Sequence, residues 1–277
     1  MNVEFKIALA QIESKRCKKK DNLEKFEKLV SKAKSSGASL IVFPEMSLTG
    51  YLIRDKIFEL AETIPGESTV RIEEIAKKTE TYIIFGMPEV SDNSRATVYN
   101  SAVLIGPEGI IGKYRKMHLP THSVFEEKRY FRAGYQLPVF KTEVGKIGLC
   151  ICYDIFFPEV TRLLRLKGAD LIVCISASPA VRKSYFEILT AARALENTSF
   201  LAYVNLVGVH DGLQFWGGSR LITPSGDIIA KGKDDIEELI ISKVDFSEIK
   251  KSEIFIPTLK DIRPELFIKL ASYAENF

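Results

Sequence analysis

Three residues with reactive or charged side chains follow apolar runs that are typical of buried strands. Cys152 follows "KIGLCI", Glu45 follows "SLIVF" and a proline, and Lys116 ends the second half of a hairpin-like stretch, "GIIGKYRK". A thiol, a carboxylate base and an ammonium are the groups that acyl transfer from nitrogen to sulfur requires. If the three strand ends meet, the sequence predicts a hydrolase with a cysteine nucleophile.

Two cysteines compete for this role in the segment "GLCICYDIFFPE". Cys152 lies between the strand and a helix expected to begin near Pro158, and such a turn exposes a side chain to backbone N–H groups and to the helix dipole. These features predict a lowered thiol pKa and a stabilised oxyanion. Cys150 lies deeper in the strand, where cysteine packs as a small apolar residue. From this segment alone, an inert buried thiol remains open for both residues.

The elements that must position these groups alternate between strands and helices. Asp21 is expected to cap an amphipathic helix that exits near Gly37. The two halves of the chain carry similar hairpins with Pro-x-Gly turns, which indicates two similar α/β layers within one domain, residues 1–277. We expect strands at 39–43, 82–90, 146–151, 169–176 and 200–208, helices at 71–80, 158–168 and 185–197, and hairpins at 99–116 and 219–232.

The end of the chain, residues 254–277, is expected to differ from the rest. Its segment "IFIPTLKDIRPELF" holds two prolines and little periodicity. We therefore predict an extended tail that runs over the surface or onto a partner subunit.

Composition and charge exclude several classes of protein. The net charge is +3 and the basic cluster 15–20 reads as a solvated helix entry, so we expect no nucleic-acid partner. No apolar run approaches the ~18 residues of a membrane helix, and the start of the chain lacks the pattern of a signal peptide. Four cysteines without CxxC spacing and three histidines without metal spacing predict neither a disulfide framework nor a metal site. A cytoplasmic protein is the expectation.

Six segments together resemble the nitrilase, or carbon–nitrogen hydrolase, superfamily. "FPEMSLTGY", "KYRKMHLP" and "GLCICYDIFFPE" are similar to its glutamate, lysine and cysteine segments, and "RALEN", "FWGGSRLITPSGD" and "RPEL" to three others in the same order. The resemblance implies a four-layer αββα sandwich, usually assembled through dimers. It also implies a triad of Glu45, Lys116 and Cys152 that uses no metal and no organic cofactor.

The resemblance implies a second glutamate in "SVFEEKRYF", which we place at Glu127 with Glu126 as the competing choice. Glu127 would then hold Lys116 or the attacking water. In the implied chemistry, Glu45 removes the thiol proton, which a free thiol pKa of ~8.5 makes necessary at neutral pH. Lys116 and the backbone N–H of Tyr153 stabilise the oxyanion.

The residues after the cysteine favour one branch of the superfamily. True nitrilases resemble Cys-Trp-Glu and the glutaminase domains of NAD synthetases Cys-Glu-Asp, whereas this chain reads Cys-Tyr-Asp at 152–154. "CYDIFFPEV" is more like amidases and omega-amidases, although "FPEMSLTGY" and "VFEEKRYF" look closest to the NAD synthetase branch. We expect hydrolysis of a small carboxamide through a cysteine thioester, with release of ammonia. The alternatives are an N-carbamoyl amidohydrolase, a nitrilase or, from another class, a catalytically silent binding protein.

Aromatic residues near the motif segments are the candidates for an acyl pocket, and each has a place in the core as its alternative. They are Tyr51, Phe125, Tyr153, Phe156 and Trp216.

Overall fold

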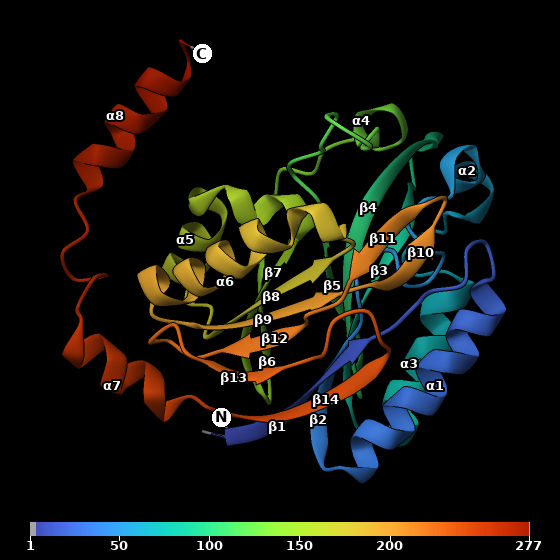
Figure 1. Cartoon of the computed structure of the whole chain (residues 1–277), viewed down its shortest axis with the longest axis horizontal. Helices are drawn as coiled ribbons and strands as arrows, with labels where there is room; N and C mark the ends of the chain where they lie inside the picture. The colour runs from blue at the N-terminus through green and yellow to red at the C-terminus, as the bar shows by residue number, and fades with distance from the viewer. Residues whose placement is uncertain (1–3, 277) are drawn as a thin grey trace.

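Two six-stranded sheets lie face to face at the centre of the molecule, between two layers of helices (Figure 1). The computed structural model describes residues 4–276. Helices α1 and α3 cover the outer face of one sheet, and α5 and α6 cover the other. The predicted four-layer αββα sandwich is confirmed.

The two sheets repeat one topology, as the similar halves of the sequence indicate. Their strand orders are β14-β1-β2-β3-β4-β5 and β13-β12-β9-β8-β7-β6. In each sheet three consecutive strands are parallel and a hairpin forms one edge. The strands are β1 (Glu4–Gln11), β2 (Ala38–Val42), β3 (Tyr82–Ser91), β4 (Ser94–Gly106), β5 (Gly109–Arg115), β6 (Val139–Thr142), β7 (Gly145–Ile151), β8 (Leu171–Ser176), β9 (Phe200–Asn205), β10 (Val207–His210), β11 (Leu213–Trp216), β12 (Arg220–Ile222), β13 (Ile228–Lys231) and β14 (Glu238–Asp245). The helices are α1 (Lys19–Ser35), α2 (Ile57–Leu60), α3 (Glu67–Thr79), α4 (Glu127–Tyr130), α5 (Pro158–Leu166), α6 (Lys183–Asn197), α7 (Ser247–Phe255) and α8 (Pro264–Ala274).

Strand alternation divides the core into layers. In β1, Ile7 and Leu9 join the core between the sheets, whereas Ala8 and Ala10 join the core under α1 and α3. Successive side chains of a strand point to opposite faces, so both faces of this strand are buried. Small alanines under the helices let α1 pack closely, and its Phe26 is buried there.

Two local predictions differ from the structure. Helix α1 begins at Lys19, so Asp21 lies in its first turn instead of capping it. The predicted strand 200–208 is interrupted at Leu206, where β9 ends and the short hairpin of β10 and β11 begins. The predicted helix exit is as expected, because Gly37 has a φ of +82°, a conformation that glycine adopts without strain.

The predicted extended tail is wrong for its second half. Residues Pro264–Ala274 form helix α8, which projects from the body of the protein beyond α7 (Figure 1). Proline fits the first turn of a helix, where no N–H partner is lost, and the segment after it contains no further breaker. Every residue of α8 is exposed, including the large apolar Leu266, Phe267 and Ile268.

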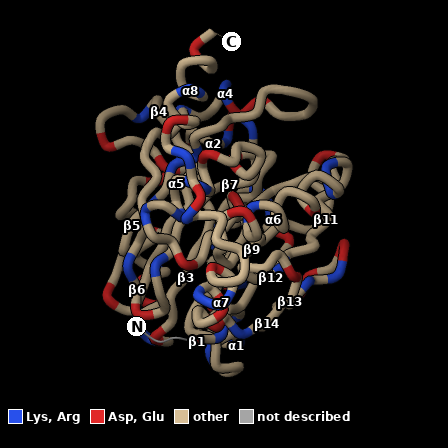
Figure 2. The backbone as a smooth tube through the Cα atoms, turned by 90° about the vertical axis from the view of Figure 1, so that its left-hand side faces the viewer, with Lys and Arg blue, Asp and Glu red and all other residues tan. Residues whose placement is uncertain are grey.

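Charged residues of both signs are interspersed along the backbone in the view of Figure 2. Among residues 4–276, no helix has the length and apolarity that crossing a membrane requires.

One glycine permits the close approach that places the end of β2. After β2, the chain crosses strand β3 at Gly86, whose N–H donates to the carbonyl of Pro44 at 3.2 Å. A Cβ at Gly86 would lie 2.4 Å from the backbone nitrogen of Met46 and 2.8 Å from the Cα of Glu45. The absence of a side chain at this position therefore lets Glu45 sit directly over the sheet.

Candidate active site

The ammonium of Lys116 lies between two carboxylates and is fully buried. Its Nζ is 2.8 Å from Glu45 Oε1 and 2.7 Å from Glu127 Oε1. Burial alone lowers the pKa of Lys116, but the negative charges of Glu127 and Glu45 outweigh burial and hold that pKa well above its ordinary value. Lys116 therefore stays charged inside the protein.

Three separate segments bring these groups together. Glu45 follows β2, and Lys116 follows β5, where its N–H still donates to the Asn100 carbonyl of β4 at 2.9 Å. Glu127 begins α4, and its N–H donates to the Pro120 carbonyl at 3.1 Å. Glu127 is buried and pairs with Lys116, whereas Glu126 is exposed, so the geometry favours Glu127 as the second glutamate.

Both carboxylate oxygens of Glu45 are held in place. Oε1 accepts from Lys116 and from the amide of Asn100, at 2.7 Å. Oε2 accepts the backbone N–H of Ala177, which follows β8 in the opposite sheet, at 2.7 Å. The two sheets are thus linked through this side chain, and its orientation is fixed before any substrate binds.

Cys152 lies at the start of the 3₁₀ turn Cys152–Phe156 that follows β7. Its φ of +47° is a strained conformation for a residue with a side chain, and such strain collects at functional sites. Cys150, two residues earlier, is fully buried in β7 opposite Cys174 of β8, in the packing position that the sequence predicts.

The prediction of a lowered thiol pKa at Cys152 is wrong. Burial raises the pKa of Cys152 well above its ordinary value, the charge of Glu45 raises it further, and Lys116 only partly opposes them. The helix α5 begins at Pro158, after the 3₁₀ turn, so its N-terminus does not directly adjoin the thiol. The sulfur therefore rests as a neutral thiol close to the charges of Glu45 and Lys116.

A buried carboxylate ties the cysteine turn to the lysine segment. Asp154 Oδ2 accepts the hydroxyl of Tyr114 at 2.7 Å and the N–H of Ile151 at 3.0 Å. Oδ1 accepts the N–H of His118 at 2.9 Å and lies 2.9 Å from its Nδ1. Tyr114 and His118 flank Lys116, so Asp154 fixes the distance between the two segments. The sequence offered no sign of this role.

Arg193 of α6 supports the same turn from the other side. Its Nε donates to the carbonyl of Ile155 at 3.0 Å, and a terminal nitrogen donates to that of Phe156 at 3.3 Å. The strained turn at Cys152 is therefore held by buried contacts on both sides.

Two cavities meet at Phe125. The smaller, about 30 Å³, is lined by Cys152 together with Phe125, Tyr153 and Phe156, three of the predicted pocket residues. The larger, about 220 Å³, lies on the side of Glu127 and is also lined by Phe125.

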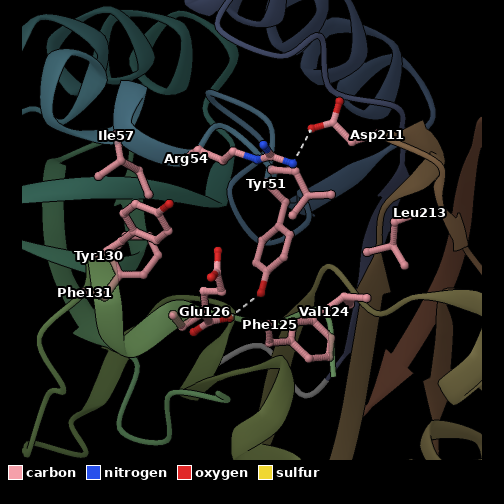
Figure 3. Close-up of a pocket in the computed structure, with 12 residues that line it drawn as sticks. Tyr51, Arg54, Ile57, Val124, Phe125, Glu126, Tyr130, Phe131, Asp211 and Leu213 are labelled. Atoms are coloured by element: carbon pink, nitrogen blue, oxygen red, sulfur yellow. Dashed lines mark hydrogen bonds and ion pairs between the residues drawn. The ribbon is translucent and has the colours of Figure 1, made fainter. Parts of the chain in front are cut away.

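Tyr51, which the sequence predicts as a substrate-binding residue, lines the larger cavity. In Figure 3 Tyr51 points toward the segment that holds Glu126, and its hydroxyl donates to Oε1 of the next residue, Glu127, at 2.5 Å. Burial and the charge of Glu127 raise the pKa of Tyr51 well above its ordinary value, so this hydroxyl stays protonated and remains a donor. Arg54 and Asp211 lie across the same cavity (Figure 3), with Arg54 3.7 Å from the Asp211 carboxylate.

Trp216 lies elsewhere. It is buried in β11 against Tyr203 of β9, with ring centroids 6.2 Å apart, and it lines neither of the two cavities. Trp216 therefore packs in the core, and its part in an acyl pocket stays a prediction. Gly218 permits this packing, because a Cβ at that position would lie 1.8 Å from the Trp216 ring.

Comparison with known proteins places this geometry in a family. The carbon–nitrogen hydrolase family model matches residues 6–253. A nitrilase of Pyrococcus abyssi is 36% identical over 271 residues, which cover 95% of this chain and 99% of the relative. The crystal structure of a carbon–nitrogen hydrolase from Helicobacter pylori G27 matches with a TM-score of 0.88 at 26% identity, over 96% of this chain and 98% of that one. A mutant amidase from Nesterenkonia sp. AN1 matches with a TM-score of 0.83 at 26% identity, over 96% of each chain, and carries the acetamide moiety of fluoroacetamide on its active-site cysteine.

The pH dependence of turnover should report the titration of Glu127. Burial, together with the charge of Glu45 and against that of Lys116, raises the pKa of Glu127 to about 7. Glu127 therefore gains a proton as the pH falls through about 7, and Lys116 then loses one of its two anionic partners. We expect kcat/KM, which reports the titration of the free enzyme, to fall on the acidic side of this value.

The variant Glu127→Gln imitates the protonated side chain. It should lower kcat/KM roughly ten- to hundredfold at neutral pH, the effect of losing one charged hydrogen bond, and remove the inflection near pH 7. Glu126→Gln, at the exposed neighbour, is the control and should keep both rate and profile. An unchanged inflection in Glu127→Gln would contradict the assignment.

Proposed function

This chain belongs to the carbon–nitrogen hydrolase family, and from that premise we propose that it hydrolyses a small carboxamide through a thioester on Cys152, releasing ammonia. The observation that carries the proposal is the neutral thiol of Cys152 beside the fixed Glu45–Lys116 pair. A neutral thiol needs a base at the moment of attack, and a carboxylate that is already oriented supplies one. The Nesterenkonia amidase, whose active-site cysteine carries the acetamide moiety of fluoroacetamide, supports a small amide as the substrate.

In the proposed first half of the reaction, Glu45 removes the thiol proton while the sulfur attacks the amide carbonyl carbon. The carbonyl oxygen becomes an oxyanion, which Lys116 and the backbone N–H of Tyr153 stabilise. Because Lys116 is buried and positively charged before the reaction, it needs little reorganisation to meet this charge. Protonated Glu45 then gives its proton to the leaving nitrogen, the C–N bond breaks, and ammonia departs.

In the second half, Glu45 removes a proton from water, and the hydroxide attacks the thioester carbon. The same donors stabilise the second oxyanion, the C–S bond breaks, and the sulfur regains a proton from Glu45. One amide and one water thus give one carboxylic acid and one ammonia, and the site returns to its starting state. Glu127 acts by holding Lys116 in place through the second ion pair.

The size of the cavity favours a short acyl group. About 30 Å³ at Cys152 accommodates only a few non-hydrogen atoms without movement of the lining side chains. Aromatic walls suit the apolar part of such a group. A nitrile would enter the same space, and the Pyrococcus relative makes nitrile hydrolysis the second candidate.

Replacing each of the two neighbouring cysteines by alanine, one at a time, tests the mechanism. Ammonia release from a panel of short aliphatic, aromatic and omega-amides, N-carbamoyl compounds and nitriles should be measured for the wild type, Cys152→Ala and Cys150→Ala. We expect Cys152→Ala to lower turnover by roughly three or more orders of magnitude, as loss of a nucleophile does. Cys150→Ala is the matched control and should keep most of the activity.

The panel also separates the alternatives. Carbon dioxide released with ammonia would mark an N-carbamoyl substrate, and turnover of nitriles alone would mark a nitrilase. Loss of activity in folded Cys150→Ala with retention in Cys152→Ala would overturn the assignment of the nucleophile. A wild type inactive on the whole panel, with a Cys152 thiol that iodoacetamide does not alkylate, would favour a silent binding protein.

We also propose that the protein works as a homodimer. Helix α8 exposes Leu266, Phe267, Ile268, Leu270 and Tyr273. The outer face of α5 and α6 exposes Leu163 and Ile188. An amphipathic helix that contacts none of its own core is stable only when another surface covers it. A second copy of the chain, with its α8 laid over the α5–α6 face, would cover both surfaces.

Light scattering after gel filtration should give twice the chain mass of 31.2 kDa. A charge on the apolar face of α8, Leu270→Glu, should weaken the dimer, because a buried unpaired carboxylate is strongly disfavoured. Val209→Glu, at an exposed apolar residue of β10, is the control and should leave the mass unchanged. A monomeric wild type at micromolar concentration would contradict the proposal.

A further inference from the structure

Strand β5 ends directly before Lys116 and lies at the edge of its sheet, beside β4. An edge strand leaves one row of its backbone groups outside the sheet, so side-chain contacts contribute more to holding its end. Side chains alternate between the two faces of a strand, and Tyr114 therefore shares a face with Lys116, whereas Lys113 and Arg115 point to the opposite face. The bond from Tyr114 to Asp154 holds the first face. The second face carries a separate set of contacts.

These contacts are centred on the carboxylate of Glu89 in β3, which is 1% exposed. Its Oε1 accepts from Lys113 at 2.6 Å and from a terminal nitrogen of Arg115 at 2.5 Å. Its Oε2 accepts from Arg115 Nε at 2.9 Å and from the hydroxyl of Ser101 in β4 at 2.6 Å. One carboxylate thus joins the three adjacent strands β3, β4 and β5 near the point where β5 leads into the active site.

Arg115 is the member of this set that adjoins Lys116. Its two parallel hydrogen bonds to Glu89 fix the plane of the guanidinium, which a single contact would leave free to turn. The guanidinium carbon also lies 3.8 Å from the centre of the Tyr99 ring. The backbone is closely packed at the same point, since a Cβ at Gly134 would lie 2.3 Å from the carbonyl oxygen of Arg115. Side chain and backbone are therefore both held immediately before Lys116.

The charge of Glu89 keeps Arg115 in this place. Burial raises the pKa of Glu89, but hydrogen bonds from Arg115, Lys113 and Ser101 outweigh burial and hold that pKa below its ordinary value. Without this charge, the cations of Lys113 and Arg115 would lie close together with no anion between them. Both side chains are 28% exposed, so their repulsion would move Arg115 toward solvent and release the end of β5.

We propose that Glu89, acting through Arg115, is a positioning residue that fixes the ammonium of Lys116 between Glu45 and Glu127. Glu89 acts from the other face of β5, by holding the residue that precedes Lys116. The catalytic consequence rests on the proposed amide hydrolysis, in which Lys116 stabilises the oxyanion. The position of the ammonium itself can be measured without turnover.

The titration of Glu127 reports where the ammonium lies. Burial raises the pKa of Glu127, Lys116 lowers it and Glu45 raises it, to about 7, and Tyr51 donates to the same carboxylate. An opposite charge within ~4–6 Å lowers a carboxylate pKa by about 1–3, so an ammonium that moves away should raise the midpoint of this titration by roughly one pH unit. Carbon NMR of protein labelled at its glutamate carboxyl carbons measures the midpoint, with the Glu127 signal identified by its absence in Glu127→Gln.

Glu89→Gln should raise the Glu127 midpoint by this amount and lower kcat/KM on the best amide of the panel roughly ten- to hundredfold at neutral pH. Arg115→Lys keeps the charge but loses the paired hydrogen bonds, so it should show both effects in smaller measure. Glu62→Gln is the matched control, because Glu62 is another ion-paired glutamate that accepts three hydrogen bonds beside β3. It should lower the melting temperature and leave the midpoint and the rate unchanged.

The outcomes separate positioning from a merely structural role. A folded Glu89→Gln with an unchanged Glu127 midpoint, or with a raised midpoint and the kcat/KM of the wild type, would overturn the inference. An equal shift in Glu62→Gln would also overturn it, since that would indicate a general loosening. If Glu89→Gln does not fold, Arg115→Met, at a partly exposed position, is measured in its place. If the wild type hydrolyses no amide, the proposed function fails, and the Glu127 midpoint alone then decides the positioning role of Glu89.

Discussion

The buried ammonium of Lys116 is the constraint on which the rest of the site depends. A charged group inside a protein is strongly disfavoured unless opposite charges and hydrogen bonds replace the water it loses. Glu45 and Glu127 supply these charges at 2.8 and 2.7 Å. Their own remaining bonds, from Asn100 and Tyr51, then fix where each carboxylate points. The arrangement is held before substrate binds, which is what electrostatic stabilisation of a developing oxyanion requires.

The repeated topology of the two sheets explains how the groups meet. Glu45 and Lys116 follow strands β2 and β5 of one sheet, and Cys152 follows strand β7 of the other. Because the sheets pack face to face, these ends share one edge of the sandwich, and Ala177 and Asp154 provide hydrogen bonds between them. One sheet thus supplies the charges and the other supplies the thiol. Burial and the charge of Glu45 keep the sulfur neutral at rest, and the charge of Lys116 only partly opposes them.

The strand patterns predict two similar α/β layers and place Glu45, Lys116 and Cys152 each after a strand. The four-layer sandwich and the triad are what the family resemblance implies. The sequence predicts the thiol pKa in the wrong direction, since burial and neighbouring charge depend on the tertiary arrangement. Long-range partners such as Asn100 have no local pattern at all. For Trp216 the sequence leaves pocket and core open, because an aromatic residue near a motif fits either until the packing is known, and the structure shows it buried.

Titration of the Cys152 thiol tests the central claim most directly. The far-ultraviolet absorbance of thiolate should be followed against pH in the wild type and in Cys152→Ala, and the difference between them reports this one sulfur. The account predicts no thiolate at Cys152 at neutral pH, with ionisation only well above the ordinary thiol pKa, because burial and Glu45 oppose the negative charge. A difference signal already complete at neutral pH would show a resting thiolate that needs no base, and it would contradict the role given to Glu45.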